Sequence, residues 1–332
     1  MKTIIIFFTL ICFVYGSRRY VDNGLHPLSD EMINQINSLG TTWKAGQNFD
    51  GVSLNAVKRL LGVPSRSNKA SKRPLRYIHH RNTNDLPESF DSRTKWPNCT
   101  SLTTIRDQGN CGSCWVFSAI EAMSDRLCIH GSIDVLLSTQ QMVTCYGDGC
   151  QGGWPESVYG IYQEEGIVSG GLYQGGGCSP YTLPPCEHHI KGPLPTCPDT
   201  YLPAPECKKE CVAGYGKTWE QDKYYGQEPY AVGYDQKQIM KEIMTNGPVS
   251  ADFTVYADFP NYKSGVYQRT TYDSLGGHAI KIIGWGTENG TDYWLVANSW
   301  NDYWGDKGYF KIRRGNNECG IEDDVVAGLP KL

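Results

Sequence analysis

The sequence predicts an α+β fold of two lobes, a helical lobe followed by a β-rich, barrel-like lobe, with a cleft between them. Residues 86–332 are long enough for two such lobes. Helical patterns and cysteines are concentrated in the first half of this region. The second half contains short runs rich in β-forming residues, separated by Gly/Asn turns, at Val249 to Tyr256, His278 to Trp285, Asp292 to Asn298 and Gly308 to Arg313.

The N-terminus reads as a cleavable secretory signal over residues 1–16. Lys2 precedes an apolar run, Ile4 to Val14, that is too short to span a bilayer. We therefore expect no membrane span, passage through the oxidising secretory pathway and disulfide formation. The sequons at Asn98 and Asn289 are candidate glycosylation sites on that route.

Charge divides the rest of the chain into a basic and an acidic part. Residues 17–85 contain 11 Lys/Arg and 5 Asp/Glu, whereas residues 86–332 contain 19 and 30. The basic charge is interspersed with apolar residues and faces an acidic partner in the same chain, which argues against a nucleic-acid or membrane ligand. The better interpretation is a propeptide, residues 17–85, that docks on its own domain, residues 86–332.

An amphipathic helix is predicted from Cys114 onward. Its apolar stripe is Val116, Ala119, Ile120, Met123 and Leu127, and its expected outward face is Glu121, Ser124, Asp125 and Arg126. Cys114 then lies at the helix N-terminus, where free N–H groups and the helix dipole favour a thiolate. This position predicts a reactive cysteine.

Cys111 and Cys114 could also form a disulfide, a redox pair or half of a zinc site. No second CxxC or His-x3-5-His pattern follows at zinc-finger spacing, so no metal is expected. The stretch Gln108-Gly109-Asn110-Cys111-Gly112-Ser113-Cys114-Trp115 resembles the nucleophile region of papain-family cysteine proteases, and most closely their cathepsin B-like group.

The basic segment resembles the short propeptide of that group at residues 26–30, 42–49 and 59–62. In the group a Leu-Cys-Gly turn lies across the active site. Leu61 replaces that cysteine here, so inhibition is expected to rest on occupancy of the cleft and not on a thiol contact. Residues 64–76 and 79–85 read as an exposed linker suited to cleavage, and Leu86 resembles the mature start.

The resemblance also implies the partners of the nucleophile. His278, in Gly276-Gly277-His278-Ala279-Ile280, is the base candidate, Asn298 would hold its ring, and Trp300 would shield that bond. Gln108 would complete the oxyanion hole with the Cys114 backbone N–H. Gly152 and Gly153 would hold substrate backbone, although Gly-Gly is otherwise a turn.

The cysteine and histidine are 164 residues apart, beyond the roughly 130 to 150 typical of papain-like enzymes. The extra length falls in about 178–211, which resembles the occluding loop of the cathepsin B-like group. There His188 and His189 would bind a substrate's C-terminal carboxylate, which implies removal of C-terminal dipeptides. His188 can meet Asp107, but a second latch of the group is replaced by Leu194 and Tyr303, so we expect strong endopeptidase activity.

Thirteen cysteines are present, of which Cys12 leaves with the signal and Cys114 must stay free. Sequence alone does not choose among the possible pairings. The resemblance implies five pairs and a buried free thiol at Cys319; the pairs are Cys99–Cys128, Cys111–Cys150, Cys145–Cys207, Cys178–Cys211 and Cys186–Cys197.

Two aspartates are candidates for the pocket that receives the second residue before the scissile bond. Asp324 stands where the cathepsin B-like group has a glutamate that admits arginine, and Asp252 stands at a small apolar position of the same pocket. Either carboxylate could instead point to solvent, as most aspartates do.

The resemblance covers nearly the whole chain after the signal and predicts a cysteine peptidase made as a zymogen. It implies no cofactor, peptide and protein substrates, inhibition by its own propeptide and by cystatin-type proteins, and a lysosomal, endosomal or extracellular location, including a digestive lumen. The alternative from another class is a catalytically inactive binding protein on the same fold. Such relatives usually lose the nucleophile, whereas Cys114, His278, Asn298 and Gln108 are all present.

Overall fold

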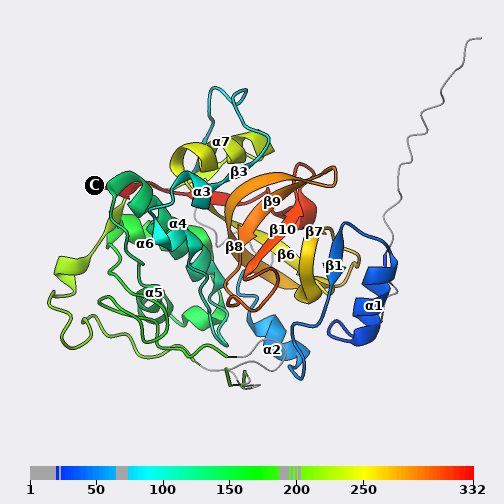
Figure 1. The fold of residues 1–332 in the computed structure, drawn as a ribbon. Helices are drawn as coiled ribbons and strands as arrows, with labels where there is room; N and C mark the ends of the chain where they lie inside the picture. The colour runs from blue at the N-terminus through cyan, green and yellow to red at the C-terminus, as the bar shows by residue number, and fades with distance from the viewer. Residues whose placement is uncertain are drawn as a thin grey trace, which may run out of the picture.

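A computed structural model describes residues 20–21, 24–64, 74–186, 194–195, 197–198, 200 and 203–332. The predicted signal peptide and the occluding-loop histidines His188 and His189 lie outside these residues. Figure 1 shows helices α4, α5 and α6 on one side of the molecule and strands β6 to β10 on the other. The predicted order of a helical lobe and a β-rich lobe is confirmed.

Seven α-helices are found in the described part of the chain. Their bounds are α1 Asp30–Ser38, α2 Leu54–Arg59, α3 Ser92–Lys95, α4 Cys114–Gly131, α5 Thr139–Cys145, α6 Pro155–Glu164 and α7 Gln236–Asn246. Three of the helices have serine N-caps. The side chains of Ser29, Ser53 and Ser138 accept a backbone N–H from the first turn of α1, α2 and α5, respectively.

The strands form one large sheet and a small pair. Their bounds are β1 Trp43–Ala45, β2 Arg76–Ile78, β3 Phe90–Asp91, β4 Tyr225–Gly226, β5 Tyr230–Val232, β6 Val249–Tyr256, β7 Tyr262–Tyr267, β8 Ser274–Glu288, β9 Thr291–Ala297, β10 Tyr309–Arg313, β11 Val325–Ala327 and β12 Pro330–Lys331. The large sheet runs β1-β7-β10-β9-β8-β6-β11-β5-β2, with β3 beside β8. It has two ends, so the term barrel-like is too strong. The run predicted to open at His278 begins earlier, at Ser274.

Helix α4 differs from the amphipathic helix that its sequence predicts, because its polar face is also buried. Glu121, Asp125 and Arg126 are at most 4% exposed. Lys281 of β8 lies 2.8 Å from Asp125 and 3.7 Å from Glu121, and Arg126 lies 2.9 Å from Glu242 of α7. Oppositely charged side chains from β8 and α7 thus pair with the charged face of α4, which would otherwise have to be solvated by water.

The predicted propeptide docks on the β-rich lobe as a continuation of its sheet. Strand β1 pairs antiparallel with β7, and Trp43 donates its indole N–H to the backbone of Gln268 at 2.9 Å. Asn48, fully buried, donates to the carbonyls of Pro260 and Tyr262. Apolar residues of α1, β1 and α2 belong to the same core as the β-rich lobe. The predicted docking of the basic segment on its own domain is observed.

The predicted linker, residues 64–76 and 79–85, is mostly exposed where the structure describes it, as expected, but part of it is paired with the peptidase domain. Residues 76–78 form β2, the last strand of the large sheet, and His80 is half-buried. Residues 81–89 are mostly exposed and contain the predicted mature start at Leu86. Residues 65–73 lie outside the described part of the chain.

Five disulfides are formed, and they are the five pairs that the resemblance implied. Cys114 and Cys319 are free; Cys319 is half-buried, so it is less enclosed than expected. The sequon residues Asn98 and Asn289 are exposed, the latter in the turn between β8 and β9.

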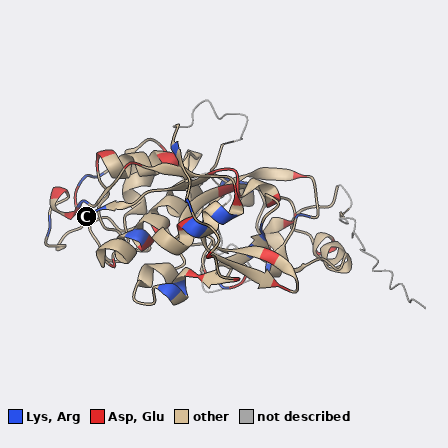
Figure 2. Cartoon of the chain, turned by 90° about the horizontal axis from the view of Figure 1, so that it is seen from above, with Lys and Arg blue, Asp and Glu red and all other residues tan. Residues whose placement is uncertain are grey.

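Acidic and basic residues are interspersed along the cartoon (Figure 2). Within the described residues, every helix is too short or too polar to cross a bilayer. The same residues contain no group of three or more His, Cys, Asp or Glu side chains arranged to hold a metal ion.

Candidate active site

The predicted nucleophile Cys114 is the first residue of α4 and is fully buried beneath the propeptide. Its sulfur accepts the backbone N–H of Gly62 at 3.2 Å. The predicted propeptide therefore contacts the Cys114 sulfur through a backbone N–H, whereas Leu61 brings no thiol to the site. This hydrogen bond occupies the sulfur of Cys114.

The predicted base His278 lies within β8 and is held by Asn298. Nε2 of the ring is 2.8 Å from Oδ1 of Asn298, which leaves Nδ1 as the nitrogen available for chemistry. The Trp300 ring lies 4.7 Å from the histidine ring, centroid to centroid, and all three side chains are at most 1% exposed. Burial excludes water from the hydrogen bond between His278 and Asn298.

Burial keeps both predicted catalytic groups neutral in this form of the protein. It raises the pKa of the Cys114 thiol to about 11, outweighing hydrogen bonds from the backbone of Ala279, Gly62 and Trp115. It lowers the pKa of His278 to about 4, against the opposing hydrogen bond from Asn298. The thiolate expected at a helix N-terminus is thus suppressed here, because desolvation of the charged form outweighs the N–H groups.

Gln108 meets the propeptide at the predicted oxyanion position. Its Nε2 donates to the Leu60 carbonyl at 3.0 Å and to the Cys111 carbonyl at 2.7 Å, while its Oε1 accepts the Ser299 hydroxyl at 2.8 Å. A carbonyl oxygen of the propeptide therefore occupies the donor that a developing oxyanion would use.

The propeptide backbone is also held on both walls of the cleft. Gly153 donates its N–H to the Gly62 carbonyl at 2.8 Å, and Val63 donates to the Gly277 carbonyl at 3.1 Å. A Cβ added to Gly62 would lie 1.7 Å from the carbonyl oxygen of Gly112. A Cβ added to Gly152 would lie 2.3 Å from the carbonyl oxygen of Gly62. Glycine at these positions allows the two backbones to approach closely.

Of the two candidate pocket aspartates, Asp252 lies in β6 and Asp324 immediately precedes β11. In the antiparallel pair β11–β6, Val325 faces Ala251 and Val326 faces Ser250. Extending this register by one residue places Asp324 opposite Asp252, and facing side chains of antiparallel strands are close neighbours. Asp252 is 3% exposed and its charge raises the pKa of Cys114, which places it near the nucleophile.

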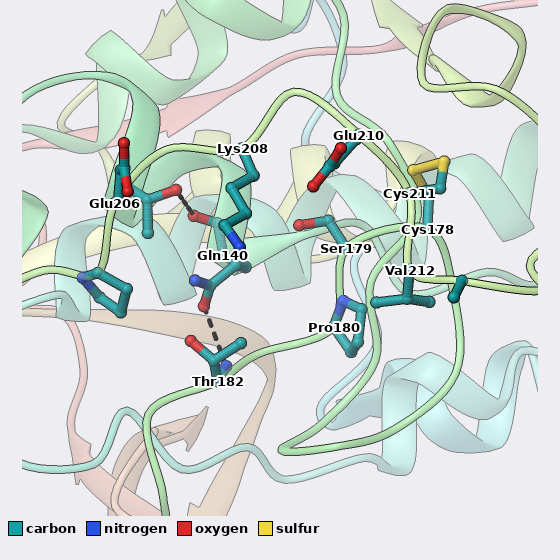
Figure 3. A pocket seen from close by; sticks show the side chains of 13 residues that line it. Gln140, Cys178, Ser179, Pro180, Thr182, Glu206, Lys208, Glu210, Cys211 and Val212 are labelled. Atoms are coloured by element: carbon teal, nitrogen blue, oxygen red, sulfur yellow. Dashed lines mark hydrogen bonds between the residues drawn. A yellow bond between two sulfur atoms is a disulfide. The ribbon is translucent and has the colours of Figure 1, made fainter.

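The predicted insertion borders a separate cavity of about 410 Å³, shown in Figure 3. Gln140 of α5 accepts the Thr182 N–H at 3.0 Å on one side, and the disulfide Cys178–Cys211 lies on another. Among the described residues that line it there is neither Cys114 nor His278, so this cavity is distinct from the predicted catalytic pair.

The latch predicted between His188 and Asp107 involves a residue outside the described part of the chain. The Asp107 carboxylate accepts the Gly109 N–H at 2.7 Å and the Asn301 amide at 3.1 Å. Tyr303 is 52% exposed. These two contacts hold the Asp107 carboxylate in place next to Gln108, the first residue of the predicted nucleophile stretch.

Ser299 is a contributor that sequence reasoning did not single out. Its hydroxyl holds Gln108, and its backbone N–H donates to Asn298 Oδ1 at 2.9 Å. It therefore links the predicted oxyanion donor to the residue that orients His278. Its place inside the Asn298-Ser299-Trp300 motif was the available signal.

Comparison with known proteins gives matches over most of the chain. The model of the papain family cysteine proteases matches residues 86–329, and the model of the peptidase family C1 propeptide matches residues 28–67. A cathepsin B-like cysteine proteinase of Schistosoma japonicum is 47% identical over 315 residues, 92% of each chain. Cathepsin B-like cysteine proteinase 4 of Caenorhabditis elegans is 46% identical over 319 residues, 93% of this chain and 94% of the relative. The structure of procathepsin B S9 from Trypanosoma congolense superposes with a TM-score of 0.80 at 36% identity, covering 93% of this chain and all of that one.

Proposed function

We propose catalytic roles for four residues of this chain, which belongs to the papain family of cysteine proteases as a cathepsin B-like cysteine peptidase with its propeptide. Cys114 is the nucleophile and His278 is the general acid and base. Asn298 orients His278, and Gln108 donates a hydrogen bond to the oxyanion. The observation that supports this assignment is that four residues spread over 191 positions of the sequence lie close together, around the short propeptide segment 60–63.

When the propeptide is removed, water reaches Cys114 and His278, and both side chains can become charged. The Cys114 thiolate then attacks the scissile carbonyl carbon, and the oxyanion is held by Gln108 Nε2 and the Cys114 backbone N–H. His278 protonates the leaving amine, which gives a thioester. It next takes a proton from water, whose oxygen attacks the thioester and releases the acid and the free thiol.

The side-chain preference follows from the aspartate pair. Two carboxylates facing each other across β11 and β6 repel, and a guanidinium placed between them relieves that repulsion. We therefore propose that Asp252 and Asp324 favour arginine as the second residue before the scissile bond. Gly152 and Gly153 hold the substrate backbone beside this pocket, as Gly153 holds Gly62 in the proenzyme.

We further propose endopeptidase activity together with removal of C-terminal dipeptides, the latter through His188 and His189. Leu194 and Tyr303 cannot form the second ion pair that would latch the insertion, so longer substrates can enter. Maturation removes residues 1–85 and leaves residues 86–332, which act on peptides and proteins and are targets of cystatin-type inhibitors. The route is the secretory pathway to the lysosome, the endosome or the exterior, with sugar at Asn98 and Asn289.

A Cys114→Ala enzyme tests the assignment against the inactive binding protein. Turnover of a dipeptide amide substrate should vanish, while circular dichroism and tight binding of the propeptide persist. A matched control is Cys319→Ala, the other free thiol, which should retain turnover. Absence of turnover in the activated wild-type enzyme would instead support the inactive binding protein.

A further inference from the structure

Residues 74–85 of the propeptide occupy a second binding site, at the end of the large sheet. Strand β2 lies parallel to β5, with Arg76 facing Tyr230 and Ile78 facing Val232. Figure 1 shows this segment rising beside α7, at the opposite side of the view from α2. β5 is then an inner strand in the proenzyme and becomes an edge when the segment leaves.

Side chains of the peptidase domain hold this segment at several points. Nε2 of His80 lies 2.8 Å from Oε2 of Glu242, and Gln238 accepts the His80 N–H at 2.6 Å while its amide donates to the His80 carbonyl at 3.3 Å. The Tyr77 and Tyr234 hydroxyls are 2.6 Å apart. The segment is therefore recognised by specific contacts in addition to the strand pairing.

The receiving surface belongs to the peptidase domain, which supplies Glu242 with partners of its own. Glu242 is fully buried, bonded to Arg126 Nη2 at 2.9 Å and to the Tyr230 hydroxyl at 2.7 Å. Burial by itself would raise the pKa of Glu242, but the Arg126 charge and the hydrogen bonds from His80, Tyr230 and Arg126 lower it to about 2, so the carboxylate is charged. Loss of His80 leaves a fixed anion beside an open strand edge.

We propose that the mature enzyme carries a peptide exosite, formed by the β5 edge, Gln238 and Glu242, that binds an extended polypeptide strand with a tyrosine followed three residues later by a histidine. Strand edges bind extended peptides through backbone hydrogen bonds, and fixed side-chain sites select among them. Tyr77 and His80 supply this pattern in the propeptide, and the same surface is then available to polypeptide substrates that carry it.

The inference rests on the proposed removal of residues 1–85, which a separate measurement examines. N-terminal sequencing of the activated enzyme reports the mature start. If residues 74–85 remain attached, the proposed boundary is wrong. The exosite is then tested in the enzyme that retains this segment. His80→Ala should speed amide exchange in β5, and His79→Ala should not.

The direct test uses the activated enzyme with Cys114 alkylated, so that the probe is not hydrolysed. The probe is a fluorescent peptide of residues 74–85, titrated by anisotropy, with amide exchange of β5 and α7 as the structural readout. His79→Ala is a matched control for His80→Ala, because it removes a neighbouring, exposed imidazole that packs beside Gly233, whereas His80 is bonded to Glu242. On the enzyme, Gln238→Ala is compared with the exposed Lys237→Ala.

We expect saturable binding, slower exchange in β5 and a Kd raised about ten-fold or more by His80→Ala, since the lost hydrogen bond is to a charged group. Gln238→Ala should also raise the Kd, whereas His79→Ala and Lys237→Ala should change it less than about three-fold. No saturable binding up to millimolar peptide, or equal losses for His79→Ala and His80→Ala, would overturn the proposal.

Discussion

Replacing Gly62 by alanine should release the propeptide from the active site. The new Cβ would lie 1.7 Å from the Gly112 carbonyl oxygen and 2.5 Å from its carbon, and contacts under 3.0 Å do not occur in real structures. The two backbones must therefore separate by about 1.3 Å, the difference between 3.0 and 1.7 Å. Gly62 has no left-handed φ, so the effect comes from contact and not from backbone strain.

That separation breaks three hydrogen bonds that now hold the segment. They are Gly62 to the Cys114 sulfur at 3.2 Å, Gly153 to Gly62 at 2.8 Å and Gln108 to Leu60 at 3.0 Å. At about 1 kcal/mol each, their loss costs about 3 kcal/mol, or roughly a hundred-fold in affinity.

The assay is inhibition of the activated enzyme by a separate propeptide of residues 17–85. Gly62→Ala should raise its Ki about a hundred-fold. Asn55→Ala on the exposed side of α2 should leave the Ki within about three-fold. A Gly62→Ala propeptide that inhibits as well as the parent would refute the close-approach argument.

Three further predictions concern acidity, specificity and the insertion. Burial in the proenzyme lowers the pKa of His278 to about 4, and the propeptide contributes to that burial. Protonation of His278 therefore opposes propeptide binding, so inhibition should weaken as pH falls towards 4, by at most about ten-fold per unit. A Ki that is flat from pH 7.5 to 4 would contradict this. Asp252→Ala and Asp324→Ala should each lower the preference for Arg-Arg over Phe-Arg substrates, and equal selectivity in both variants and the wild type would reject the acidic pocket. Peptides with blocked C-termini should be cleaved efficiently, since the insertion lacks its second ion pair; a strict requirement for a free C-terminal carboxylate would rule that out.

Local patterns in the sequence determined the family, the order of the lobes and the candidate catalytic residues. The stretch around Cys114 and the motifs around His278 and Asn298 are each contained in a few consecutive residues, so their chemistry can be read without a fold. The glycine at position 62 was visible in the same way. The reason for it was not, because that reason is an oxygen of Gly112, fifty residues away.

The tertiary structure decided the features that depend on contacts between distant segments. Helix α4 looks amphipathic in isolation, but Lys281 covers its acidic residues and Glu242 covers Arg126. Residues 74–76 read as a linker from their composition, but Arg76 begins β2, which pairs with the otherwise open edge of β5. The pKa of Cys114 is raised although its helix position favours a thiolate, because residues 60–63 exclude water from it. In each case burial by a remote segment changed the free energy of a charge or a backbone group, and local sequence carries no record of that partner.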